Sequence, residues 1–294
     1  MKGLRGKILY AEPLSHHTTL RVGGAADAMV EPADLADLEW LMEQIRKFKL
    51  PCFVIGAGSN LVVRDGGIRG LVIRLSRFTR IEKLDETSFY AESGLSLPKL
   101  CRFARNESLG GLEFACMIPG SVGGGIKMNA GIAEREISDV VQSVKVLSAG
   151  GEILDLTARE AGFGYRSSRI PRGVVLGGVF KLRKSSVKEI EEKSRVLIKR
   201  RKETQPLSYP NVGSIFKNPP GKFAGTLIEE IGLKGCRIGG AQISEKHANF
   251  IINRGNATAK DILALIKKSG REVQDKKGVV LELEVKIVGE NDHQ

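Results

Sequence analysis

The sequence predicts an α+β fold that opens with an α/β unit, and two patterns carry this prediction. In the first, apolar residues recur at helical spacing after Pro32 and Asp34, and Pro51 ends the helix. Short apolar strands around glycine turns follow this helix, at Cys52–Ile55, Leu61–Val63 and Leu71–Ile73. In the second, strand-like runs alternate with single helices after about residue 80, which is typical of α+β proteins.

The later elements follow from apolar spacing and turn residues. Gly232 ends one helix, and Gly270 ends another that a capping box at Thr258–Asp261 opens. Residues 279–287 alternate apolar and charged side chains, as a half-buried strand does. The expected helices are Leu97–Ser108, Val187–Arg201, Phe223–Ile231 and Ile262–Lys268, and the expected strands are Phe89–Glu92, Val140–Leu147, Glu152–Asp155, Gly173–Leu182 and Phe250–Ile252.

The chain length of 294 residues corresponds to about two domains. The charged helix ends at Gln205-Pro206, and we place the domain boundary there. We therefore predict an N-terminal domain at 1–203, with subdomains of about 1–75 and 76–203, and a smaller α+β domain at 204–294.

Composition and charge restrict the function classes. The 41% hydrophobic and 27% charged residues are typical of a globular protein rather than a disordered or fibrous one. The net charge of +12 favours anionic partners, such as nucleic acid, anionic membrane or phosphorylated small molecules. Aromatic residues make up only 5%, which argues against a protein that binds single strands by stacking. Residues 181–203 hold ten Lys and Arg against four Glu, a pattern more typical of a solvated helix face than of a nucleic-acid patch.

The cysteines and the apolar segments indicate the cellular setting. The four cysteines form no C-x-x-C pair, so we expect no zinc site and no metal. The first ten residues lack the apolar core of a signal peptide, and no apolar run approaches about 18 residues. We expect a cytoplasmic protein with reduced thiols and no membrane insertion.

Two glycine-rich loops are candidate anion-binding sites. Gly56–Asn60 begins like the dinucleotide fingerprint, but the third glycine is missing and a strand follows in place of a helix. Its backbone N–H groups can form a nest for a pyrophosphate, although a plain turn explains the loop equally well. The second loop, Pro119–Gly125, lacks the Lys of a Walker A motif, and Met128–Gly131 extends it. Two such loops suggest a large anionic cofactor, with close structural turns as the alternative.

The order of several motifs along the chain resembles the UDP-N-acetylenolpyruvoylglucosamine reductase family, flavoenzymes of bacterial peptidoglycan synthesis. The resemblance extends from about residue 15 to 289. No single motif is specific, but the ordered set is. The motifs are His17–Gly24, Gly56–Asn60, Ile118–Gly124, Met128–Gly131, Tyr165–Ser168, Gly213–Pro219, Gly239–Gln242, His247–Phe250 and Leu281–Val285.

The resemblance implies an FAD-binding domain of the vanillyl-alcohol-oxidase type at 1–203 and a substrate-binding domain at 204–294. It implies that NADPH reduces FAD, which then passes hydride to the enolpyruvyl group of a UDP-sugar to give UDP-N-acetylmuramate. The first glycine loop holds no histidine, so we expect a noncovalent flavin. The cofactor-binding residues implied are Gly56, Ala57, Gly58, Ser59, Asn60, Pro119, Gly120, Ser121, Gly123, Gly124 and Asn129.

The resemblance also assigns a catalytic trio, namely Arg166, Glu284 and the proton donor Ser214. It places Tyr165, Lys217 and Asn218 near the substrate, and the uninterrupted segment from Arg166 to Ser214 matches the class that lacks an extra tyrosine-bearing loop. The chemistry agrees with the trio. An arginine fork stabilises the charge that hydride addition sends into the substrate carboxylate, and the neighbouring carbon then needs a proton.

Ordinary structural roles compete with each assignment. Outside this motif set, Arg166 would be a surface ion-pair residue, Ser214 a turn residue and Glu284 a water-facing strand residue. We interpret His247 as structural or substrate-proximal rather than as a base. Two other functions remain open: a different FAD-dependent oxidoreductase of the same fold acting on a sugar or alcohol, and a basic nucleic-acid-binding protein. We expect a small-molecule substrate and no nucleic acid, and the sequence does not indicate an oligomeric state.

Overall fold

The computed structural model describes residues 3–132 and 135–292, which fall into two compact units. Unit 1 comprises Met1–Leu9, Ala28–Ala57 and Gly70–Lys199, and unit 2 comprises Tyr10–Asp27, Gly58–Arg69 and Arg200–Gln294. The chain passes from unit 1 to unit 2 for the last time between Lys199 and Arg200, close to the predicted boundary at 203/204. The structure differs in giving two N-terminal segments to the C-terminal unit. Residues 133–134, in the loop after Gly131, lie outside the described residues.

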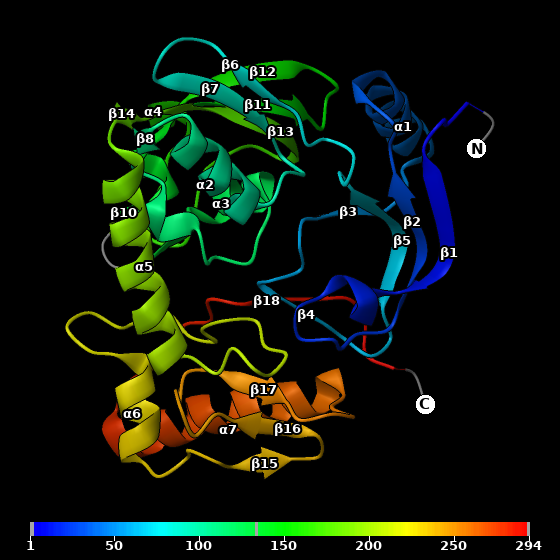
Figure 1. Cartoon of the computed structure of the whole chain (residues 1–294). Coiled ribbons are helices and arrows are strands. Elements are labelled where there is room, and N and C mark those ends of the chain that lie inside the picture. The colour runs from blue at the N-terminus through cyan, green and yellow to red at the C-terminus, as the bar shows by residue number, and fades with distance from the viewer. Residues whose placement is uncertain (1–2, 133–134, 293–294) are drawn as a thin grey trace. The chain divides into compact units, whose positions relative to one another are not determined.

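The predicted helix and two of the three predicted strands form the N-terminal α/β unit, whereas the strand at Leu61–Val63 pairs elsewhere. Helix α1 (Leu35–Phe48) begins at Asp34, whose carboxylate accepts the Asp37 N–H at 3.0 Å. Strand β3 (Cys52–Ile55) pairs in parallel with β5 (Ile68–Arg74), in a sheet of order β1-β2-β5-β3 (Figure 1). The sequence did not indicate β1 (Lys7–Pro13) or β2 (Ala25–Glu31). The apolar face of α1 packs in one core cluster with residues of β2 and β5.

The rest of unit 1 is built on an antiparallel sheet of order β12-β11-β13-β7-β6. Its strands are β6 (Ile81–Lys83), β7 (Ser88–Glu92), β11 (Val141–Ser148), β12 (Ile153–Thr157) and β13 (Gly173–Lys181), so the predicted strands are present with small shifts of their ends. The hairpin between β11 and β12 turns at Gly151, which has φ +95° as a glycine turn requires. This alternation of strands and helices confirms the α+β fold class.

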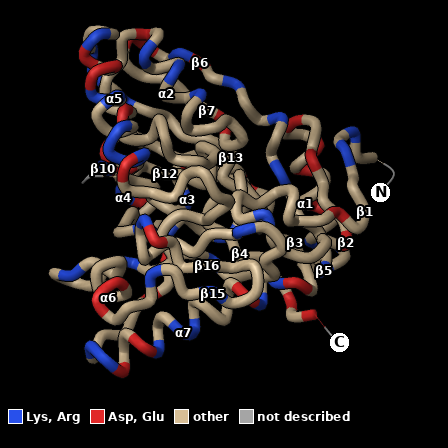
Figure 2. The backbone as a smooth tube through the Cα atoms, turned by 60° about the horizontal axis from the view of Figure 1, so that its bottom comes forward, with Lys and Arg blue, Asp and Glu red and all other residues tan. Residues whose placement is uncertain are grey.

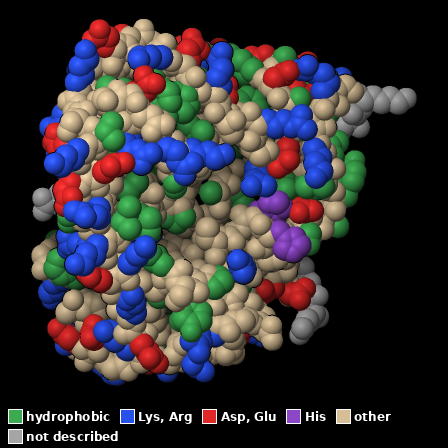
Figure 3. Space-filling view, viewed as in Figure 1, with side chains coloured by type: hydrophobic (Ala, Val, Ile, Leu, Met, Phe, Trp, Pro, Cys, Tyr) green, Lys and Arg blue, Asp and Glu red, His purple; other side chains and the backbone are tan. Residues whose placement is uncertain are grey.

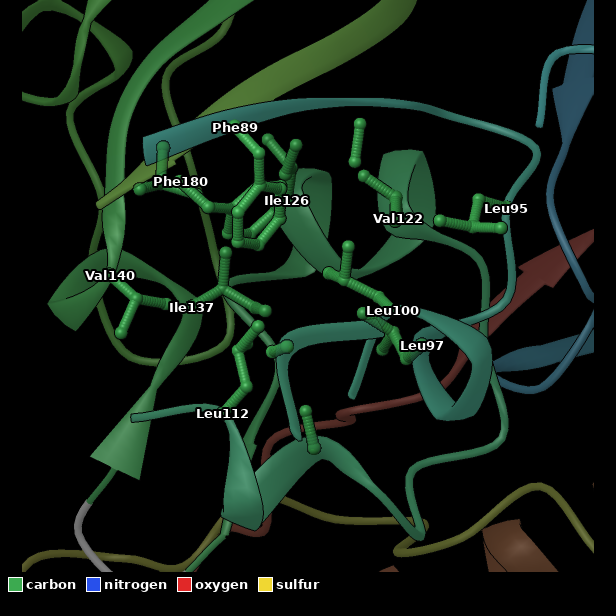
Figure 4. Close-up of a cluster of buried hydrophobic side chains, with 14 of the residues drawn as sticks. Phe89, Leu95, Leu97, Leu100, Leu112, Val122, Ile126, Ile137, Val140 and Phe180 are labelled. Atoms are coloured by element: carbon green, nitrogen blue, oxygen red, sulfur yellow. The ribbon is translucent and has the colours of Figure 1, made fainter. Parts of the chain in front are cut away.

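The main core of unit 1 lies between this sheet and two short helices, α2 (Leu97–Asn106) and α3 (Val122–Met128). Figure 4 shows Phe89, Phe180 and Ile126 together, with Leu97 and Leu100 beyond them. The rings of Phe89 and Phe180 stack at 5.7 Å between centroids. The smaller elements of unit 1 are β8 (Leu109–Gly110), β9 (Gly131–Ile132), β10 (Arg135–Glu136), α4 (Ala158–Ala161) and β14 (Arg183–Lys184).

Unit 2 has its own core around α6 (Ala224–Glu230) and α7 (Ala259–Lys277). Its three-stranded antiparallel sheet has the order β15-β16-β17, formed by Arg237–Ile238, Ala241–Ile243 and Ile251–Asn253. Strand β4 (Leu61–Val63) pairs in parallel with β18 (Lys286–Val288). The predicted alternation at 279–287 is correct in its faces, since Val279, Leu281, Leu283, Val285 and Ile287 belong to or pack on the core. Regular strand begins only at Lys286, and Val280 is exposed.

The predicted end of the last helix at Gly270 is wrong. Helix α7 continues to Lys277 and ends at Gly278, which has φ +67°. The helix continues because its apolar face continues: Ser269 is 1% and Val273 0% exposed. A Cβ at Gly270 would meet only the Phe216 ring, at 3.9 Å, so packing does not require a glycine here. The helix tolerates it at a cost of about 1 kcal/mol relative to alanine.

The basic run at 181–203 lies mainly on α5 (Val187–Thr204). Along this helix Lys193 pairs with Glu189 and Arg195 with Glu192, so the two signs alternate (Figure 2). The face in Figure 3 likewise shows Lys and Arg interspersed with Asp and Glu. Only Ile190 is buried, which makes α5 a solvated, mixed-charge helix in agreement with the structural interpretation.

The described part of the chain shows neither a membrane-spanning helix nor a cluster of metal ligands. Its helices include none that is long and apolar enough to cross a membrane. Within 3–132 and 135–292, no group of three or more His, Cys, Asp and Glu side chains could hold a metal ion. The four cysteines are free thiols.

Candidate functional site

The second glycine loop leads into a short helix that the sequence did not indicate. Ser121 caps α3, with its Oγ accepting the Gly124 N–H at 3.3 Å. Just before the helix, the carbonyl of Gly120 accepts the Leu97 N–H at 2.9 Å. The N–H of Gly123 donates to the Ser93 carbonyl, also at 2.9 Å, so the loop is fixed on the segment that leads into α2.

The three glycines of α3 have different reasons for lacking a side chain. A Cβ at Gly123 would lie 2.7 Å from the Ser93 Cβ, and one at Gly125 would lie 3.2 Å from Leu97. Both are therefore explained by internal packing. A Cβ at Gly124 would have only the Ser121 Oγ near it, at 3.4 Å. Packing does not require this glycine, and the predicted close approach of a ligand to it stays a prediction.

The first glycine loop is divided between the units. In unit 1, the exposed Gly56 lies against the second loop, because its Cβ would be 2.7 Å from the Ser121 Oγ. In unit 2, Gly58 has φ +62°, and its Cβ would be 2.0 Å from the His17 carbonyl oxygen. Gly58 is thus required by the turn itself, whereas Gly56 and Ser121 bring the two predicted loops together within unit 1.

Arg166 occupies a tight turn in unit 1 with an unusual backbone. The backbones of Gly164 and Ser167 exchange hydrogen bonds of 3.0 and 3.1 Å, and Arg166 between them has φ +53°. This left-handed conformation costs a non-glycine residue about 1–2 kcal/mol. A glycine would fit the turn better, so the strain is consistent with the predicted role of this side chain, which stays a prediction.

The Arg166 guanidinium has defined partners. Its Nη2 donates to the Gly131 carbonyl at 2.9 Å, and its Nη1 lies 3.4 Å from Glu136 Oε1. The guanidinium carbon is 5.0 Å from the centroid of the Tyr165 ring, and Tyr165 itself is 47% exposed. No sequence motif indicates a role for Glu136, which is identified only by its position beside Arg166.

Asn129 lies at the other end of the same network. It is 1% exposed, and its Oδ1 accepts the Ser138 N–H at 2.9 Å. Its Nδ2 donates to Glu136 Oε2 at 2.6 Å and to the Gly164 carbonyl at 3.1 Å. The Asn129 amide therefore binds protein groups, and its predicted contribution to cofactor binding stays a prediction.

Ser214 and Glu284 lie on adjoining segments of unit 2. The Glu284 N–H donates to the carbonyl of Ile215, the residue after Ser214, at 2.9 Å. Asn60 contacts the Glu284 segment, because its Nδ2 donates to the Glu284 carbonyl at 3.1 Å. Gly213, just before Ser214, has φ +78° and no atom within 4 Å of a Cβ, so this side of the turn is open. The structure thus brings three predicted site residues together.

Asn249 holds the Ser214 segment through its side-chain amide, a role that the sequence did not predict. It is 3% exposed, its Oδ1 accepts the Phe216 N–H at 3.0 Å and its Nδ2 donates to the Phe216 carbonyl at 2.8 Å. Its own N–H donates to His247 Nδ1 at 3.2 Å. Burial, assisted by the nearby Lys234, lowers the pKa of His247. The sequence feature that could have indicated this role is a polar residue between the apolar Ala248 and Phe250.

The remaining predicted substrate residues have protein partners. Lys217 Nζ lies 2.5 Å from Glu282 Oε1, and Asn218 Oδ1 accepts the Ala224 N–H at 3.1 Å at the start of α6. Arg166 and Asn129 belong to unit 1, whereas Ser214, Glu284, Lys217 and Asn218 belong to unit 2. The assignments of all these residues to catalysis or substrate binding stay predictions.

Comparisons with known proteins identify two family domains along the chain. Residues 26–157 match the family model "FAD binding domain", and residues 205–288 match "UDP-N-acetylenolpyruvoylglucosamine reductase, C-terminal domain". The chain is 48% identical to UDP-N-acetylenolpyruvoylglucosamine reductase 2 of Symbiobacterium thermophilum, over 97% of this chain and 94% of the relative. It is 46% identical to the reductase of Geobacillus thermodenitrificans, over 96% and 93%. The crystal structure of the Thermus caldophilus reductase superimposes with a TM-score of 0.82 at 37% identity, covering 97% of this chain and 99% of that one.

Proposed function

This chain belongs to the UDP-N-acetylenolpyruvoylglucosamine reductase family, and we propose that it uses NADPH, through FAD, to reduce the enolpyruvyl group of UDP-N-acetylglucosamine enolpyruvate to UDP-N-acetylmuramate. It is an FAD-containing oxidoreductase of peptidoglycan precursor synthesis. The observation that carries the proposal is the 48% identity over 97% of the chain. We also propose that 1–203 holds FAD and that 204–294 binds the UDP-sugar.

The second glycine loop fits the cofactor. Gly124 lacks a side chain where packing does not require this, and Gly56 adjoins Ser121. When bound, FAD supplies the carrier that takes hydride from NADPH and delivers it to the substrate. The residues that the proposal assigns to it are Gly56, Ala57, Gly58, Ser59, Asn60, Pro119, Gly120, Ser121, Gly123, Gly124 and Asn129.

Each catalytic side chain has a separate task in this proposal. Arg166 binds the substrate carboxylate with its planar fork and stabilises the negative charge that develops there. Ser214 donates a proton to the carbon next to the one that receives hydride, which completes reduction of the double bond. Glu284 orients the substrate carboxylate or shares its proton. Tyr165, Lys217 and Asn218 bind the remainder of the substrate.

A flavin spectrum tests the proposal. The purified protein should be yellow, NADPH should bleach it, and the UDP-sugar should restore the colour without oxygen. Acid precipitation should release the flavin into the supernatant, because it is noncovalent. Bleaching without recovery would favour another oxidoreductase of this fold. A colourless protein retained on DNA or RNA in a salt-dependent manner would favour the nucleic-acid-binding alternative.

The two neighbouring glycines of α3 test the cofactor loop. Gly124→Leu should give a folded protein that has lost most of its FAD, since the added side chain occupies the ligand face. Gly123→Ala changes a glycine that packing already requires, and it should instead lower the melting temperature through its collision with Ser93. Flavin content and thermal unfolding of both variants are the measurements. Full FAD in Gly124→Leu would contradict the placement of the cofactor on this loop.

A further inference from the structure

The half-buried network around Arg166 has a member that neither the motifs nor the chemistry of the reaction assigned. Glu136 lies in β10, opposite Gly131 of β9 in the antiparallel register. A Cβ at Gly131 would lie 2.3 Å from the Arg135 carbonyl oxygen and 2.8 Å from Glu136 Cγ, so a glycine is needed where β10 approaches β9. Its two carboxylate oxygens have different partners, Arg166 and Asn129.

One oxygen of Glu136 is held by a rigid group. Oε2 accepts from Asn129 Nδ2 at 2.6 Å, and Asn129 cannot turn easily, because the Ser138 N–H and the Gly164 carbonyl bind the rest of its amide. The Glu136 N–H donates to Asp139 Oδ2 at 2.9 Å, which fixes the backbone as well. The carboxylate is therefore oriented before any ligand arrives.

The other oxygen faces the arginine. Oε1 lies 3.4 Å from Arg166 Nη1, while Arg166 Nη2 donates to the Gly131 carbonyl at 2.9 Å. These contacts engage two of the five guanidinium donors and define the plane of the fork. The side chains of Arg166 and Glu136 are 19% and 28% exposed, so solvent screens the pair only in part.

We propose that Glu136 is a positioning residue for Arg166, and that it sets the orientation in which Arg166 receives the carboxylate of the enolpyruvyl substrate. The inference rests on the proposed function, since it requires Arg166 to bind that carboxylate. A long arginine side chain loses considerable rotamer freedom when it binds, and a fork fixed beforehand loses less. Glu136 acts through Arg166 and does not touch the reacting atoms.

The test compares Glu136→Gln with Asp139→Asn in the holoenzyme. Glutamine keeps the shape and can still accept from Asn129, but it presents an amide to Arg166 in place of a carboxylate. Asp139→Asn alters a carboxylate of the same turn that contacts the Glu136 backbone. Stopped-flow absorbance measures flavin bleaching by NADPH and flavin re-oxidation by the UDP-sugar separately. Thermal unfolding and flavin content report folding.

We expect Glu136→Gln to bleach at the wild-type rate, and to re-oxidise about 10- to 100-fold more slowly at low UDP-sugar concentration. Asp139→Asn should change re-oxidation less than about 3-fold. In an Arg166→Ala background the glutamine substitution should add less than about 2-fold, because its effect passes through the arginine. Glu136→Asp, which keeps the charge, should recover part of the loss.

Several outcomes would overturn the inference. They are an equal loss in Glu136→Gln and Asp139→Asn, a loss that persists in full in the Arg166→Ala background, and unchanged re-oxidation in Glu136→Gln. A wild-type flavin that the UDP-sugar fails to re-oxidise would instead overturn the proposed function itself. That result is seen before any variant is made, so the two failures are distinguishable.

Discussion

Arg166 and Ser214 are fixed in different ways. Arg166 depends on side chains, since Glu136, Asn129 and a strained backbone together define its guanidinium. Ser214 depends on backbone hydrogen bonds, since its neighbour Ile215 joins both Glu284 and Asn249 through main-chain atoms. The difference follows from side-chain length. A serine hydroxyl is placed once its Cα is placed, whereas a guanidinium several bonds from its Cα needs partners of its own.

Replacing the serine should have the largest effect. Ser214→Ala should leave flavin bleaching by NADPH nearly normal and should slow re-oxidation by the UDP-sugar about 10²–10⁴-fold, a barrier increase of about 3–5 kcal/mol. Stopped-flow measurement of both half-reactions checks this. Equal losses in both steps would indicate a folding role, and an unimpaired second step would leave Glu284 or water as the donor.

Replacing Asn249, whose amide holds the Ser214 segment, should have the next largest effect. Asn249→Ala leaves the buried N–H and carbonyl of Phe216 without partners and should lower the free energy of unfolding by about 2–4 kcal/mol. Denaturant unfolding measures this. The exposed Asn106 offers a control, and Asn106→Ala should change stability by less than about 0.5 kcal/mol. A stable Asn249→Ala protein would mean that the strand contacts alone fix this segment.

Changing the arginine fork tests the other region. Arg166→Lys keeps the charge but loses the planar fork, so it should slow re-oxidation by the UDP-sugar about 10- to 100-fold. Unfolding should be little affected, because lysine meets the same backbone strain. Rates measured over a range of UDP-sugar concentrations give the result. Wild-type rates in this variant would show that charge suffices and that the side-chain network is dispensable.

Lowering the pH should have the smallest effect, a loss of the stability that the neutral His247 contributes next to Asn249. The pKa of His247 is lower in the folded protein than its ordinary value near 6.5, so the unfolded chain binds more protons below that pH. The contribution to stability is complete above pH 6.5 and is lost as the pH falls towards the folded pKa, at no more than about 1.4 kcal/mol per pH unit. A protonated Nδ1 also cannot accept the Asn249 N–H.

Urea unfolding of the wild type and of His247→Gln at pH 7.5, 6.5 and 5.5 measures this contribution. The stability advantage of the wild type should shrink as the pH falls. An advantage that is constant across the three values would show that His247 does not titrate in this interval.

Local sequence patterns predicted most elements, and long-range contacts account for the rest. Asp34 and the Thr258–Asp261 box act within one helical turn, and both caps are present. Helix α3 was missed because three successive glycines oppose helix formation, and it persists through its packing on Ser93 and Leu97.

In the candidate site, the motif order identified the residues but not their partners. Glu136 is 30 positions from Arg166, and Asn249 is 33 positions from Phe216. No local pattern encodes such pairs, because the fold alone brings them together.

The parallel pairing of β4 with β18 has a consequence for how the protein is made. Val62 pairs with Ile287, and Leu20, Val22 and Val62 belong to the unit 2 core, whose other members come mostly from beyond residue 200. At about 5–20 residues per second, the ribosome adds Ile287 roughly 11–45 s after Val62. Until then these apolar side chains lack their partners. Unit 2 is therefore completed only after β18 has been made, and a chain cut short before β18 would expose apolar surface to the cell's chaperones and proteases.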